Sequence, residues 1–105
     1  MTTQKPSVKT RPWDPAEHIR DDEDAAVYLD VALDEGDHQD VAWALGVIAR
    51  AKGMAAVAEA TGLGRESLYK ALSHQGNPEF ATILKVVKAL GLQLHASVAE
   101  AKPES

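Results

Sequence analysis

Residues 54–73, MAAVAEATGLGRESLYKALS, decide the fold that this sequence predicts. Ala58 is small at the point where two helices would touch. Gly62 follows four residues later, where the chain must enter the left-handed conformation that glycine adopts without strain. Apolar residues that close the angle between the two helices are Val57, Leu63, Leu68 and Leu72. The stretch predicts a helix-turn-helix, although an ordinary antiparallel helix pair with a glycine loop would give a similar pattern.

The second helix of this unit has one polar face. At 100° per residue, five of its polar residues fall within an arc of roughly 140°, and Leu68, Ala71 and Leu72 face away from it. These polar residues are Arg65, Glu66, Tyr69, Lys70 and Ser73. Gly64 stands just before the helix, where a missing side chain would let the first backbone N–H groups approach a phosphate. We expect one face to pack and the other to contact DNA.

The rest of the chain predicts further short helices. Asp14-Pro15 is a helix-start pair, and Asp21 to Asp24 places negative charge at the start of a second helix that ends near Gly36. Asp37 caps a third helix that runs to Lys52. Asn77-Pro78 starts the last helix, as cap and first residue, and Gly91 stops it. The apolar stripes of these three longer helices are Ala25, Leu29, Ala32 and Leu33; Val41, Leu45, Ile48 and Ala49; and Phe80, Ile83, Leu84, Val87 and Leu90.

The predicted fold class is therefore all-α, with five to six short helices in one domain. We expect a flexible arm over residues 1–12, the helical domain over 13–97 and a flexible tail over 98–105. Leu92, Leu94 and Ala96 alternate with polar residues, which predicts a short C-terminal strand. Such a strand would pair with its copy in a second subunit; an ordered tail packed on its own domain explains the alternation equally well.

Charge is unevenly distributed along the 105 residues, whose formal net charge is −5. Residues 1–50 hold five Lys/Arg against eleven Asp/Glu, whereas residues 51–105 hold six against five. The predicted helix-turn-helix half is thus mildly basic. The chain has no cysteine, no apolar run near the ~20 residues of a membrane span and no visible secretory signal. We expect a soluble, cytoplasmic protein without membrane contact.

Enzyme and cofactor motifs are weak in this sequence. Residues 62–67, GLGRES, resemble the start of a dinucleotide fingerprint, but no strand precedes them and serine replaces the third glycine. The four histidines lack metal-ligand spacing, and residues 34–40, DEGDHQD, lack the ligand pattern of a calcium loop. The sequence predicts no catalytic residue, no metal site and no cofactor.

The order of helices around MAAVAEATGLGRESLYKALS, followed by GNPEFATILKVVKALGLQL, resembles the lambda-repressor-like helix-turn-helix domains of the Cro/C1 (XRE) type. More narrowly, the run DDEDAAVYLDVALDEGDHQDVAWALGVIARAKGMAAVAEATGLGRESLYKALS is similar to the antidotes of HigA-like addiction modules. The likeness covers about residues 13–96. It implies an antitoxin that neutralises a RelE/ParE-like toxin and, as a homodimer, represses its own operon by binding double-stranded operator DNA. A stand-alone Cro/C1-type repressor without a toxin partner, or an interaction module that has lost DNA binding, would share much of this pattern.

Carried onto this sequence, the resemblance makes four residues candidates for base contact: Arg65, Glu66, Tyr69 and Lys70. Arg65 would bind guanine, Glu66 would accept from a cytosine amino group, and Tyr69 would contact a thymine methyl. Contacts to the DNA backbone fall to Lys70, Ser73, His74 and Asn77. Glu66 is explained equally well as a favourable charge in a first helical turn. Asn77 is better explained as a cap than as a DNA contact, although it can be both, and a solvated side chain is the alternative for His74.

The toxin implied by the resemblance is expected to be basic, so the acidic part of the chain, Asp14 to Asp40, is its electrostatic match. Within it the sequence singles out Asp21, Asp22 and Asp24, with Trp13 as an aromatic anchor. Trp13 would equally well pack into its own core.

Overall fold

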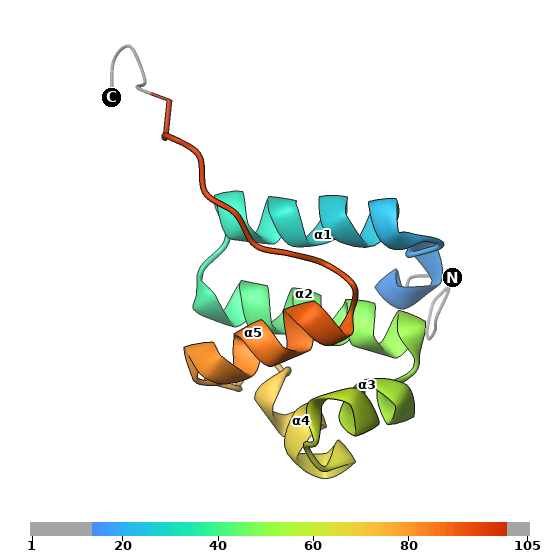
Figure 1. Cartoon of the computed structure of the whole chain (residues 1–105). Helices are drawn as coiled ribbons and strands as arrows, with labels where there is room; N and C mark the ends of the chain where they lie inside the picture. The colour runs from blue at the N-terminus through green and yellow to red at the C-terminus, as the bar shows by residue number, and fades with distance from the viewer. Residues whose placement is uncertain (1–13, 101–105) are drawn as a thin grey trace, which may run out of the picture.

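The computed structural model describes residues 14–100 of the chain. This part contains five α-helices and one 3-10 turn, joined by loops (Figure 1). In chain order they are η1 (Pro15–His18), α1 (Asp22–Glu35), α2 (His38–Lys52), α3 (Met54–Thr61), α4 (Arg65–Ala71) and α5 (Phe80–Ala89). The prediction of an all-α, helix-turn-helix-like fold is confirmed.

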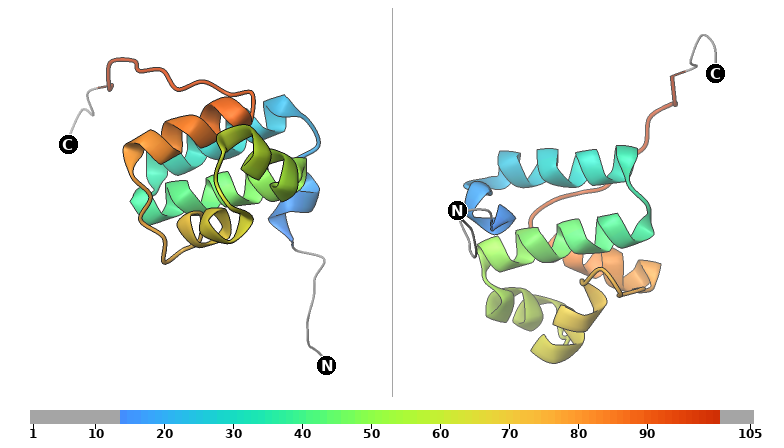
Figure 2. Two further views of the ribbon diagram at one scale, coloured as in Figure 1. Left: turned by 60° about the horizontal axis from the view of Figure 1, so that its bottom comes forward. Right: turned by 180° about the vertical axis from the view of Figure 1, so that it is seen from behind.

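Helix α2 is the centre of this arrangement. It contacts η1, α1, α3 and α5, and its residues Leu45 and Ile48 are fully buried. Figures 1 and 2 show α1 on one side of α2, with α3 and α4 on the other. The main core cluster joins all five helices: Ala25, Leu29, Ala44, Leu45, Ile48, Ala49, Met54, Val57, Ala58, Leu68, Leu72, Val86, Val87 and Leu90.

Local signals in the sequence set most helix ends. The Asp21 side chain accepts a hydrogen bond from the Asp24 amide at 2.9 Å and caps α1, which ends at Gly36. Asp37 and Asp40 form a capping box at the start of α2, with both side chain to amide distances at 3.0 Å. Gly53, at φ 111°, lets α3 leave α2 at 110°.

The first helical segment, η1, is a single 3-10 turn and not an α-helix. The Asp14 carboxylate accepts from the Ala16 amide at 3.1 Å and Pro15 follows, as predicted, but the chain makes only one 3-10 turn before Ile19. Arg50 of α2 binds the same carboxylate oxygen at 3.1 Å, so η1 is held on α2 by an ion pair.

The predicted start of the last helix is wrong. Asn77 does not cap α5: the chain stays extended through Glu79, and α5 begins at Phe80. Pro78 is compatible with a first helical position but does not require one. As a consequence Phe80 lies in the first turn with 67% of its surface exposed, although its place in the apolar stripe predicted burial. Leu33 of α1 was likewise expected inside and is 48% exposed.

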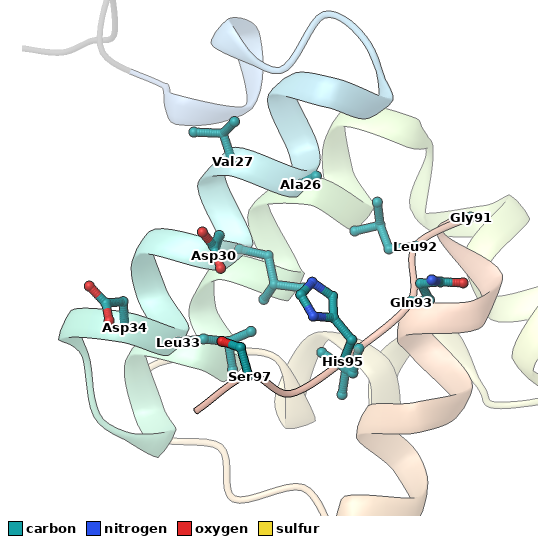
Figure 3. Close-up of a pocket in the computed structure, with 12 residues that line it drawn as sticks. Ala26, Val27, Asp30, Leu33, Asp34, Gly91, Leu92, Gln93, His95 and Ser97 are labelled. Carbon is teal, nitrogen blue, oxygen red and sulfur yellow. The ribbon is translucent and has the colours of Figure 1, made fainter. Parts of the chain in front are cut away.

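The segment after Gly91 forms no strand within the residues that the structure describes. Leu92 and Leu94 are half-buried against the core, Gln93 and His95 are exposed, and the segment runs beside α1 (Figure 3). The alternation was thus correct for burial and wrong for strand formation, because an extended chain laid on a core needs no paired neighbour. Pairing with a second copy stays a prediction.

No single helix in residues 14–100 is long and apolar enough to cross a membrane. Only α2 and α3 taken together reach that length and composition, and they do so as a pair bent by 110°.

Candidate nucleic-acid interface

The turn between α3 and α4 has the geometry that its sequence predicts. Gly62 is left-handed at φ 77°, and its amide donates to the Ala58 carbonyl at 2.9 Å. The Thr61 hydroxyl donates to the Val57 carbonyl at 2.9 Å and accepts from the Leu63 amide at 3.3 Å. These contacts tie the turn to the last turn of α3, so the direction in which α4 leaves is set locally.

Helix α4 is held by its apolar side. Leu68 is fully buried and Leu72, just past its end, is 3% exposed, both within the core that contains Val57 and Ala58. The opposite side, which we call the α4 face, consists of Arg65, Glu66, Tyr69 and Lys70. All four of these side chains are exposed, Tyr69 by 46%. The structure therefore presents the four predicted base-contact residues together on the surface.

The residues predicted to contact a DNA backbone lie beside this face. Lys70, Ser73 and Asn77 line one hollow of about 490 Å³ between the end of α4 and the start of α5. The Ser73 hydroxyl donates to the Lys70 carbonyl at 2.9 Å, which satisfies one of the last carbonyls of α4 and leaves its oxygen able to accept. Gly64 precedes α4 with no side-chain cap, and a Cβ at this position would meet nothing within 4 Å.

His74 is not simply a solvated side chain. Its ring stacks on Trp43 of α2, with centroids 4.3 Å apart and planes 16° apart, and the Arg50 guanidinium lies 5.5 Å from the Trp43 centroid. The stack joins the segment after α4 to the central helix. Sequence reasoning missed it, because the two rings are far apart in the chain and neither carries a local signal.

The acidic residues singled out by sequence have intramolecular roles. Asp21 caps α1, Asp22 binds Lys52 at 2.7 Å, and Asp24 binds Arg20 at 3.0 Å. The Arg20 side chain donates a hydrogen bond to the Asp24 carboxylate, which holds the pKa of Asp24 below its ordinary value and raises the pKa of Arg20. Trp13 lies outside the described residues.

Two exposed valines on α1 escaped the sequence analysis. Val27 is 63% exposed and Val31 is 50% exposed, one helical turn apart on the side away from the core. The signal was present in the sequence: both lie off the stripe of Ala25 and Leu29.

Within residues 14–100 no group of three or more His, Cys, Asp or Glu side chains is placed to hold a metal ion.

Fold and surface together define an all-helical protein of the helix-turn-helix-like class. The profile of a family described as "Probable addiction module antidote protein" matches residues 9–98. An uncharacterized protein of Haemophilus influenzae is 49% identical over 81 residues, which are 77% of this chain and 84% of the relative. No solved structure matches the chain. The chain belongs to this family of addiction module antidotes, that is, antitoxins. Membership in this family implies a toxin as the partner.

Proposed function

We propose that this antidote is a HigA-like antitoxin of a type II module, with a Cro/C1-type domain, that neutralises a RelE/ParE-like toxin in the cytoplasm. As a homodimer it would also repress its own operon by binding operator DNA. The observation that carries the DNA-binding part is the α4 face. A helix whose Leu68 is fully buried presents Arg65, Tyr69 and Lys70 to solvent on its other side.

The dimensions of this unit suit a major groove, which admits one α-helix. The α4 face combines the Arg65 guanidinium, the Tyr69 phenol and the Lys70 ammonium group. The first two suit contacts to bases, and the ammonium group suits contacts to phosphates. The local charge supports the same proposal: from Lys52 to Leu90 the chain holds five Lys/Arg against three Asp/Glu. This is a weak electrostatic footprint, and a dimer would double it.

The first experiment is purification of the tagged chain expressed from its native locus, with mass identification of what co-purifies and a growth test of that protein alone. A small basic protein that arrests growth supports the antitoxin proposal. If nothing co-purifies while the chain still protects DNA upstream of its own gene, the stand-alone repressor is correct. If the isolated protein binds operator no better than random DNA, the repressor part of the proposal fails.

Two substitutions on α4 test the assigned contacts. Lys70→Glu should weaken binding to all DNA about equally and lower the slope of log affinity against log salt by about 1, because one phosphate contact is lost. Arg65→Ala should relax preference at one base pair, at a cost of roughly 1–3 kcal/mol for the preferred base. Lys88→Glu on α5 makes the same charge change outside the α4 face and is the matched control. It lowers the general positive charge but removes no predicted phosphate contact, so the salt slope should stay close to that of the parent. The opposite pattern would mean that the two roles are exchanged.

A further inference from the structure

The outward side of α1 exposes apolar surface that the fold does not use. Val27 and Val31, 63% and 50% exposed, lie one turn apart. A groove of about 770 Å³ runs on one side, between α1 and the segment from Gly91 to Ser97 (Figure 3). A second groove of about 470 Å³ lies on the other side, where Ile19, Tyr28 and Trp43 join the two valines as lining. Helix α1 therefore stands between two grooves, of which the first has a mixed lining and the second a mainly apolar one.

Carboxylates surround the two valines. At 100° per residue, four acids share an arc of roughly 140° with Val27 and Val31. We call these six residues the α1 ridge: Glu23, Val27, Asp30, Val31, Asp34 and Glu35. Each of the four acids is exposed, and none forms an ion pair within residues 14–100. Figure 3 shows Asp30 and Asp34 one turn apart on this helix, with Val27 on the turn before.

The fold gains nothing from part of this charge. Asp34 and Glu35 lie in the last turn of α1, which holds no basic residue, and the helix dipole disfavours negative charge at that end. By contrast, Asp21 caps the helix, and Asp24 and Asp22 pair with Arg20 and Lys52. Glu23 has no such ion pair, but it lies in the first turn, where the helix dipole favours negative charge. The charge at the end of the ridge is therefore better explained by something that binds there than by stability.

We propose that the α1 ridge is the docking surface for a basic protein partner, whose groove receives the helix with apolar contacts at its floor and cationic groups at its walls. The identification of this partner as the toxin rests on the proposed function. A second copy of this chain does not suit the ridge, because α1 has six acids and no Lys or Arg, so that two such helices would repel each other. Helices α1 and α4, which carry the ridge and the α4 face, lie on opposite sides of α2 (Figure 1).

The test uses the full chain and the growth-arresting protein purified with it. The double variant Val27→Ser, Val31→Ser removes apolar contact from exposed positions, and we expect at least tenfold weaker binding of that protein by calorimetry. Val98→Ser makes the same change at a side chain that is 93% exposed and should leave the affinity within twofold. The thermal midpoint and operator affinity of the Val27→Ser, Val31→Ser double variant should stay close to those of the parent.

Charge reversal on the α1 ridge tests the electrostatic contribution to partner binding separately from the apolar one. Asp30→Lys with Asp34→Lys should slow association at least tenfold at low salt and by much less at high salt, because screening removes the attraction. Glu59→Lys on α3 is the control and should not slow it.

Each outcome of these measurements decides for or against the proposal. Unchanged affinity in both double variants overturns the docking surface while the antitoxin function stands. A parent chain that captures no growth-arresting protein overturns both proposals. If the serine variant loses self-association in sedimentation instead of partner binding, the occupant is a second copy and the proposal is wrong.

Discussion

Gly46 tests how the helix-turn-helix is seated on the central helix. Gly46 is buried within α2, where a Cβ would lie 3.2 Å from the Leu72 Cβ and in closer, forbidden contact with the Leu72 carbonyl oxygen. Because one of these is a backbone atom, Gly46→Ala requires the end of α4 to move. Overpacking of this kind costs about 1–3 kcal/mol, and the higher helix propensity of alanine returns about 1 kcal/mol. We expect a net loss of about 0–2 kcal/mol in the free energy of unfolding.

Urea unfolding followed by circular dichroism measures this loss, and the thermal midpoint should fall by roughly 4–8 °C per kcal/mol. Operator affinity should also fall, because Leu72 directly follows α4. Gly64→Ala is the matched control for stability alone, because Gly64 belongs to the predicted DNA contact. Its φ of −71° is ordinary and a Cβ there meets nothing within 4 Å, so stability should change by about 0.5 kcal/mol or less. If Gly46→Ala is more stable than the parent, propensity alone is acting, and the end of α4 does not rest on α2.

Two further predictions concern single side chains. Hydrogen bonds from the Asp40 and Gln39 amides hold the pKa of Asp37 below its ordinary value, so this cap contributes stability above the unfolded pKa and loses it as the pH falls through the folded pKa. Below about pH 4 the thermal midpoint of the parent should therefore fall, and that of Asp37→Asn should fall by less. An equal fall in both proteins would show that the cap does not titrate as described. His74→Ala removes the stack on Trp43 and should cost about 0.5–1 kcal/mol with a change in Trp43 emission. Unchanged emission would mean that the rings do not stack in solution.

Helix ends were predictable where one residue decides them. Asp21 and Asp37 cap because a carboxylate can reach the amides two or three residues on, and Gly62 turns because few other residues adopt its φ. The start of α5 was not predictable in this way. Asn77-Pro78 is compatible with a helix start two residues before the observed one, and only packing decides between them.

Contacts between distant segments were beyond the sequence pattern. The stack of His74 on Trp43 depends on the path of the chain after α4, which no local spacing encodes. The acids at the start of α1 were singled out because of their density, and density does not distinguish a carboxylate that already has a partner from one that does not. The structure makes this distinction: Asp22 binds Lys52, whereas Asp30 has no ion pair among the described residues.

This distinction bears on how a chain of net charge −5 would bind DNA. Packed helices lie about 8–10 Å apart and α4 packs on α3, so α1 and α4, on opposite sides of α2, are separated by roughly 16 Å or more. The Debye length at physiological salt is about 8 Å, so the α1 ridge would contribute little repulsion at a phosphate beside α4. The charge that matters at each surface is the local one. An acidic face can therefore serve a basic partner without weakening DNA binding, provided that the two surfaces stay on opposite sides of α2 in the assembled protein.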